Sequence, residues 1–255
     1  MPKISLCLET VFPELKLADR IRKAADAGFQ AVEFWDPSSA DLSGIAAAAA
    51  ACNVAIVGCT LSEPRVYQMD RQAGPVVANV RKSVAIAREL GCPTLIGLSS
   101  DLEGHRDSQK NILIENLKRV ADIVAQAGVT LVLEPLNSLV DHKGCYLDSA
   151  MVGFEIVKCV DCPNIKLLFD IYHMQIMEGN LVTNITPNIG LVGHFHTAGV
   201  PGRHEPYPCE VNYPFIMKKI DELGYQRYVG LEYWPTYDHA RSIRDSRLYL
   251  SGQEA

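Results

Sequence analysis

The amino-acid sequence predicts a closed (β/α)₈ barrel, an α/β fold in which eight parallel strands alternate with helices around one core. Eight short apolar runs alternate with longer helical patterns along the chain. Most of these runs are almost continuously apolar, as expected for parallel strands that are covered on both faces. The length of 255 residues is typical of such a barrel. We therefore expect residues 1–255 to form a single domain.

The eight predicted strands are short runs rich in aliphatic residues. In chain order they cover residues 3–8, 31–36, 54–59, 94–99, 130–136, 165–173, 191–198 and 228–235. A helical pattern separates each strand from the next, so the strands are expected to run parallel.

Two of the intervening segments have the clearest helical periodicity, with apolar residues three or four apart along one face. These apolar stripes consist of Leu113, Leu117, Val120 and Val124 in one segment, and of Tyr213, Ile216, Ile220 and Leu223 in the other. The segment 177–190 is the least regular of the predicted helices, because it contains β-branched residues and Pro187. The apolar stripes of residues 113–124 and 213–223 are expected to pack on the outside of the sheet.

Glycine marks four predicted helix ends, and a strand run follows each within a few residues. These glycines are Gly28, Gly91, Gly128 and Gly224. Glycine adopts the left-handed conformation that ends many helices at little cost. An open, doubly wound sheet is the alternative fold, but it usually has a glycine-rich phosphate turn after the first strand. Here the first strand continues into LETVFPELKLADR, which has no G-x-G.

Composition narrows the class of function. The net charge is −6 and no basic block is present, so we expect no binding to nucleic acid or to an anionic membrane surface. The N-terminus has no signal-peptide pattern, and no apolar run is long enough to span a membrane. The eight cysteines are scattered and mostly in apolar surroundings, which favours reduced cysteines in a cytoplasmic protein. The sequence leaves the oligomeric state open, including a homo-oligomer.

Four consecutive predicted strands each carry a side chain of metal-ligand type at the C-terminal end. These are Glu134 in LVLEPLN, Asp170 in LLFDIYH, His196 in LVGHFHTAG and Glu232 in YVGLEYWP. A single glutamate at a strand end is more often an ion-pair partner or a helix cap, but four in succession indicate a ring. In a parallel barrel the active site is built where the C-terminal strand ends meet.

Three carboxylates and one imidazole, with no thiolate, favour a divalent ion such as Mn²⁺, Mg²⁺ or Co²⁺ over a structural zinc. Such an ion can polarise a substrate carbonyl and stabilise the enediolate that forms when the adjacent carbon loses a proton. Glu134 and Glu232 are then the expected acid/base pair. The pattern predicts an isomerase or epimerase that acts on a small keto sugar or keto acid.

Three further residues near these strand ends have two interpretations each. His173 could hold a substrate hydroxyl, or it could be a core or capping histidine. Arg203 could bind a substrate carboxylate, or it could be an ordinary surface arginine. His194 lies two residues before His196, so it points to the same side one layer deeper. We interpret it as an interior histidine with its polar atoms paired, and the alternative is that it supports a metal ligand from behind.

Around these residues the chain resembles the xylose isomerase-like barrel superfamily, and within it the hydroxypyruvate isomerase branch. The matching segments are AGFQAVEFWDP (27–37), LEPLN (133–137), FDIYHMQIMEGNL (169–181), VGHFHTAGVPGRHEP (192–206), VNYPF (211–215) and VGLEYWP (229–235). The resemblance implies a TIM barrel and conversion of hydroxypyruvate to tartronate semialdehyde through an enediolate. It also implies a divalent metal held by Glu134, Asp170, His196 and Glu232, the two glutamates as acid/base pair, and His173 and Arg203 as substrate contacts.

Other members of the superfamily provide alternatives. Hydroxypyruvate isomerases often have glutamine where this chain has His196, and histidine there is more typical of ketose 3-epimerases of the D-tagatose/D-allulose type. Those epimerases carry another glutamate six positions after the strand-five ligand, where this chain has Val140. Abasic-site endonucleases on the same barrel need additional histidines near the ends of strands three and four. A non-catalytic or partner-dependent sugar-processing subunit is the remaining alternative.

Overall fold

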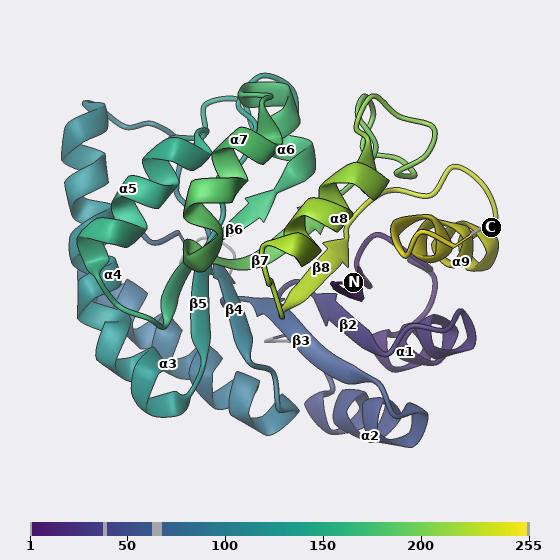
Figure 1. The fold of residues 1–255 in the computed structure, drawn as a ribbon. Coiled ribbons are helices and arrows are strands. Elements are labelled where there is room, and N and C mark those ends of the chain that lie inside the picture. The colour runs from purple at the N-terminus through teal and green to yellow at the C-terminus, as the bar shows by residue number, and fades with distance from the viewer. Residues whose placement is uncertain (1, 38–39, 63–67, 254–255) are drawn as a thin grey trace.

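The computed structural model describes residues 2–37, 40–62 and 68–253, and every structural statement below concerns these residues. Eight parallel strands form a closed barrel in the order β1 to β8, and β8 pairs with β1 to complete it. The helices form a layer around the outside of the barrel (Figure 1). The predicted fold class is therefore confirmed.

All eight predicted strands are present. They are β1 (Lys3–Cys7), β2 (Ala31–Phe34), β3 (Ala55–Thr60), β4 (Thr94–Gly97), β5 (Thr130–Leu133), β6 (Ile165–Asp170), β7 (Val192–Thr197) and β8 (Tyr228–Leu231). Most predicted ranges extend too far at the C-terminal end. Residues 134–136 and 232–235 leave the sheet as loop, and residues 171–173 already belong to a helix. Apolar composition continues past these ends because most of the following residues are also buried, although Trp35 and Trp234 are exposed.

The helices are α1 (Leu17–Asp26), α2 (Leu42–Cys52), α3 (Ala73–Leu90), α4 (Arg106–Ala127), α5 (Ala150–Val160), α6 (Ile171–Met177), α7 (Leu181–Ile185), the 3₁₀ helix η1 (Thr186–Leu191), α8 (Tyr213–Glu222) and α9 (His239–Leu250). The stripe predicted on α4 is fully buried against the barrel. The irregular segment 177–190 forms the short α7 followed by η1, and Pro187 lies in the first turn of η1. Proline is tolerated there because the first N–H groups of a helix have no partner within the helix.

The four glycines predicted to end helices all adopt positive φ angles, between 64° and 85°. Gly91 and Gly128 are the C-caps of α3 and α4, and Gly28 and Gly224 follow the last residues of α1 and α8 closely. Each turn leads directly into the next strand, so this part of the sequence prediction is confirmed.

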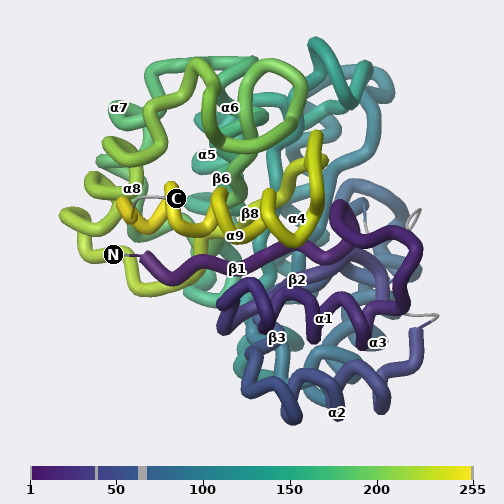
Figure 2. The backbone as a smooth tube through the Cα atoms, turned by 90° about the vertical axis from the view of Figure 1, so that its right-hand side faces the viewer, coloured from purple at the N-terminus to yellow at the C-terminus, as the bar shows by residue number. Residues whose placement is uncertain are grey.

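The main core lies between the barrel and its helices, and a smaller apolar cluster of Ile96, Val132 and Leu168 fills one side of the barrel interior. The C-terminal helix α9 contacts both α1 and β1, so the two ends of the chain pack together (Figure 2). All eight cysteines are free thiols. Within the described residues, none of the helices combines the length and the apolar character that crossing a bilayer would require.

Candidate active site

The predicted ligand ring lies beside a cavity of about 430 Å³ at the C-terminal ends of the strands. The walls include Glu134, His196, Arg203 and Glu232, together with Glu33, Trp35, Thr60, Ile96, Leu98 and His142. A volume of this size is typical of a site for a small molecule.

Glu134, Asp170, His196 and Glu232 converge as the sequence predicts. Each offers one ligand atom, and the four atoms lie within 4.8 Å of one another. His196 Nδ1 lies 3.4 Å from both Glu134 Oε1 and Glu232 Oε2. Asp170 is beside His196 because the two residues are paired in the register of β6 and β7. We refer to these four residues as the ligand ring.

The ligand ring is buried, and no member is more than 6% exposed. Burial raises the pKa of Asp170. Burial also opposes a charge on His196, yet Glu232 and Glu33 raise the pKa of this imidazole well above its usual value. Glu134 Oε1 and His196 Nδ1 have no hydrogen-bond partner among the described residues. Unpaired buried polar atoms are costly, so a ring of this composition fits a divalent cation at its centre.

Glu232 is the most heavily contacted member of the ring. Trp35 donates its indole Nε1–H to Glu232 Oε1 at 2.7 Å, and the Arg203 guanidinium donates to Oε2 at 2.5 Å. Burial favours the protonated acid, but Arg203 and His196 hold the pKa of Glu232 well below its usual range. Trp35 was not singled out in the sequence, because its role depends on β2 and β8 lying close together in the closed barrel.

Arg203 lies on the loop after β7, in the left-handed conformation with φ 58°. The side chain turns back into the barrel mouth, where its guanidinium lies 5.5 Å from the centre of the Tyr172 ring. The surface-arginine interpretation is therefore wrong. The Arg203 side chain is part of the cavity wall, and its buried Nε atom has no hydrogen-bond partner among the described residues.

His173 is fully buried in the first turn of α6, with Nε2 at 3.4 Å from Asp170 Oδ2. Asn137 Nδ2 lies 2.7 Å from His173 Nδ1, and Asn137 Oδ1 accepts from the backbone N–H groups of Val140 and Asp141. The amide orientation is thereby fixed, so His173 Nδ1 accepts and Nε2 carries the hydrogen. Burial lowers the pKa of His173 to about 3, so the imidazole is neutral at ordinary pH.

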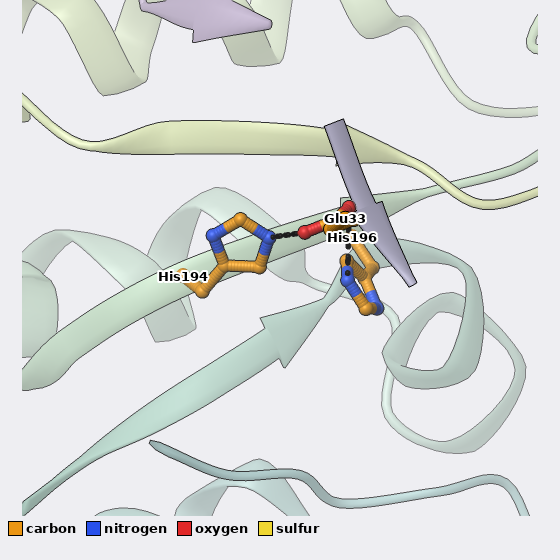
Figure 3. Close-up of side chains that lie close together, drawn as sticks. All are labelled: Glu33, His194 and His196. Carbon is orange, nitrogen blue, oxygen red and sulfur yellow. Dashed lines mark ion pairs between the residues drawn. The ribbon is translucent and has the colours of Figure 1, made fainter. Parts of the chain in front are cut away.

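His194 points into the barrel on the same side as His196, as its spacing predicts. Its Nε2 lies 2.6 Å from Glu33 Oε2, and His196 Nε2 lies 3.3 Å from Glu33 Oε1 (Figure 3). Burial favours the acid form of Glu33, but His194 and His196 hold its pKa down at about 2. Glu33 was missed in the sequence as a site residue. A glutamate inside the otherwise apolar run AVEF was the available signal.

The structure also places the residues that distinguish the ketose 3-epimerase and endonuclease alternatives. Val140 is 57% exposed in the loop after β5 and does not line the cavity. At the ends of β3 and β4, where an endonuclease cluster needs histidines, the cavity wall consists of Thr60, Ile96 and Leu98. These side chains are poor metal ligands.

A closed (β/α)₈ barrel with a cavity at its C-terminal strand ends is typical of proteins that act on small molecules, and the buried ring of carboxylates and imidazole beside this cavity could hold a metal ion. The model of the xylose isomerase-like TIM barrel family matches residues 21–251, and the chain belongs to that family.

Individual relatives match nearly the whole chain. A 2-oxo-tetronate isomerase of Cupriavidus necator is 31% identical, covering 98% of this chain and 99% of its own. The hydroxypyruvate isomerase of Escherichia coli is 29% identical, covering 92% of this chain and 94% of its own. A crystal structure described as an AP endonuclease of family 2 from Brucella melitensis is 30% identical, covers 100% of both chains and superimposes with a TM-score of 0.91.

Proposed function

We propose that the protein is a divalent-metal-dependent isomerase of a small hydroxy-keto acid, of the hydroxypyruvate isomerase type. The observation that carries the proposal is the ligand ring, whose four buried ligand atoms lie within 4.8 Å of one another beside the cavity. The isomerase class is supported by the two isomerase relatives, which match at least 92% of this chain. The eight free cysteines suit a reducing compartment such as the cytoplasm.

The ligand ring would hold the metal, and its oxygen and imidazole donors favour Mn²⁺, Mg²⁺ or Co²⁺. When bound, the ion would polarise the substrate carbonyl and stabilise the negative charge that develops on the substrate oxygens. His196 would contribute Nδ1, because this nitrogen faces Glu134 and Glu232.

The proposed reaction moves hydrogen between two adjacent carbons. One proton leaves the carbon that bears the hydroxyl group, and one is added to the former carbonyl carbon. The hydroxyl proton passes to the former carbonyl oxygen, so atoms and charge balance and no oxidant is needed. Glu134 and Glu232 are the proposed acid/base pair: one carboxylate removes the carbon-bound proton, and the same or the opposite one returns it.

Arg203 and His173 are the proposed substrate contacts. The Arg203 guanidinium is part of the cavity wall and stays charged at any relevant pH, so it can donate to a substrate carboxylate. A keto acid therefore suits this cavity better than a neutral ketose does. His173 is neutral with hydrogen on Nε2, but this nitrogen faces Asp170 Oδ2 at 3.4 Å and His173 is not among the residues that line the cavity. Its proposed contact therefore requires a substrate oxygen that reaches past the cavity wall to Nε2.

The test is proton NMR in D₂O with the Mg²⁺-loaded protein. The substrate panel is hydroxypyruvate, 2-oxo-tetronate, D-fructose, D-tagatose and L-ribulose, with EDTA-treated protein as the control. The expected result is product formation and deuterium incorporation from a keto acid only. Epimerised ketose would assign the protein to the 3-epimerases instead. No exchange on any substrate with Mg²⁺ bound would contradict the proposal and favour a partner-dependent subunit.

The Brucella melitensis structure is described as an AP endonuclease, so a second experiment tests for endonuclease activity. A duplex oligonucleotide with an abasic site is incubated with the same metal-loaded protein. We expect no incision, because the strand ends that would complete a multi-metal cluster carry aliphatic and hydroxyl side chains. Metal-dependent incision at the abasic site would favour the endonuclease alternative.

A further inference from the structure

Glu33 connects two distant strands inside the barrel. It lies on β2, while His194 and His196 lie on β7, and β1 and β8 separate these strands in the sheet order. Figure 3 shows the carboxylate between the two imidazole rings, with one oxygen toward each. A buried charge that bridges two strands in this way is costly unless both oxygens are paired.

Two glycines leave space for this carboxylate. A Cβ atom at Gly230 on β8 would lie 1.9 Å from Glu33 Oε1, and one at Gly58 on β3 would lie 3.1 Å from Glu33 Oε2. The same Cβ at Gly230 would lie 2.8 Å from His196 Cδ2. Any side chain at residue 230 would therefore displace both Glu33 and the His196 ring. Glycine at these two positions leaves the room that the Glu33 carboxylate needs beside His196.

The two nitrogens of His196 face different groups. Nε2 faces Glu33 Oε1 at 3.3 Å, whereas Nδ1 faces the ring carboxylates Glu134 and Glu232. Without a metal, the carboxylates on both sides favour a hydrogen on each nitrogen. With a metal in the ligand ring, Glu134 and Glu232 would bind the ion, and the Glu33 carboxylate, which only accepts, would keep the hydrogen on Nε2. The lone pair is then on Nδ1, on the side where the metal is proposed to bind. His194 pairs with the other oxygen of Glu33 and so restricts how the carboxylate can rotate.

We propose that Glu33 is a positioning residue that fixes the ring orientation and tautomer of His196, with His194 holding Glu33 in place. This inference rests on the proposed function, because it assumes a metal in the ligand ring. Glu33 itself does not ligate the metal. It prepares one nitrogen of His196 to do so by binding the hydrogen on the other.

The test uses Co²⁺ as the probe and does not require activity. In the Co²⁺-loaded wild type, the Nε2–H proton of His196 should give a hyperfine-shifted resonance that exchanges slowly with solvent, because Glu33 covers it. Calorimetric titration gives the Co²⁺ affinity in parallel. The Glu33→Gln and Glu33→Ala variants should bind Co²⁺ about 10- to 100-fold more weakly. In Glu33→Ala the shifted resonance should be lost by rapid exchange.

The matched control is Glu205→Gln, which alters a buried carboxylate bonded to Ser242 and Thr236, outside the ligand ring. It should keep the wild-type affinity and the shifted resonance. Wild-type affinity and slow exchange in Glu33→Ala would overturn the inference, as would the absence of any slowly exchanging histidine proton in Co²⁺-loaded wild type. If the Glu33 variants fail to fold, the wild-type measurement still tests the proposed tautomer of His196, and calorimetry with His194→Ala tests whether the support of Glu33 affects Co²⁺ affinity.

Two other outcomes also overturn the inference, and they are distinguishable. Two Co²⁺ ions per wild-type chain, of which Glu33→Ala and His194→Ala each lose one, would make Glu33, His194 and His196 a second cation site. No Co²⁺ binding by the wild type would contradict the proposed metal site itself, and the positioning role with it.

Discussion

The two glutamates of the ligand ring have different surroundings. Glu232 is held by Trp35 and Arg203, whereas Glu134 Oε1 has no hydrogen-bond partner among the described residues. If both move protons, Glu134→Gln and Glu232→Gln should each reduce turnover by about 10²- to 10⁴-fold. Deuterium exchange into the substrate measures this loss, and far-UV circular dichroism checks the fold. Near-normal exchange in either variant would remove that glutamate from the acid/base pair.

The indole of Trp35 should tune Glu232. Trp35→Phe removes the N–H donor that stabilises the ionised carboxylate, so the pKa of Glu232 should rise. If Glu232 must be ionised, the acidic limb of the kcat/KM profile moves to higher pH. Trp234→Phe is the matched control, because Trp234 packs edge-on against Trp35 with ring centres 6.5 Å apart. Equal profiles for the two variants would argue against this role.

Arg203 should select for acidic substrates. Arg203→Ala removes the guanidinium from the cavity wall, so KM for a keto acid should rise about tenfold or more. If the protein also turns over a ketose, Arg203→Ala should lower kcat, because Arg203 contacts Glu232, and should change KM much less. Steady-state kinetics on both substrates separate these effects. An unchanged KM for the acid would mean that Arg203 serves Glu232 alone.

At the residue scale, the sequence predicted those site residues whose position depends only on where a strand ends. The ligand ring could be found because its four members each lie near the C-terminal end of a predicted strand. Glu33 and Trp35 could not be assigned, because their partners lie on β7 and near β8 and become neighbours only when the barrel closes. The spacing of His194 predicted its side of the sheet, and the identity of its partner needed the structure.

At the scale of single elements, Asp170 has two roles. It ends β6, and its Oδ1 accepts the backbone N–H groups of Tyr172 and His173 as the N-cap of α6. The sequence prediction extended the strand to residue 173 because apolar composition does not reveal a cap. A side-chain oxygen at this position therefore serves both the helix and the ligand ring.

These two roles can be separated by substitution. Asp170→Asn keeps a good cap and removes a buried charge, so the EDTA-treated protein should melt at or above the wild-type temperature. Asp170→Ala should lose about 1 kcal/mol of stability through the missing cap. Both variants should lose most of the Mn²⁺-dependent rise in melting temperature. Thermal melts with EDTA and with Mn²⁺ measure this, and a full Mn²⁺ response in Asp170→Asn would exclude Asp170 as a ligand.

At the scale of the whole molecule, stability should depend on pH through His173. Its pKa is about 3 in the folded protein and about 6.5 when unfolded, because burial disfavours the charged ring. Between these values the unfolded chain binds a proton that the folded protein does not. This contribution is therefore intact above pH 6.5 and falls by about 1.4 kcal/mol per pH unit below it.

The comparison with His173→Gln isolates this contribution from that of the many carboxylates. Urea denaturation of metal-free protein at several values between pH 4 and pH 7.5 gives the free energy of unfolding. The wild type should lose more stability than the variant as the pH falls. Parallel curves for the two proteins would mean that His173 becomes protonated in the folded state.

The fold could be predicted from the sequence more completely than the site could. Alternating apolar runs, apolar helical stripes and four glycine turns are local signals of the barrel. The structure contains the strands, helices and turns that they predicted. The boundaries were less accurate at the C-terminal strand ends, where residues leave the sheet but stay buried. Contacts across the interior could not be predicted, since they depend on strands far apart in the sequence.

The pairing of β1 with β8 also matters during synthesis. The first strand emerges from the ribosome more than 220 residues before the last one, as Lys3 and Tyr228 face each other in the register. Until then, β1 and β7 both present unpaired backbone edges, which are surfaces that promote association between chains. A polypeptide that stalls before β8 keeps both edges open.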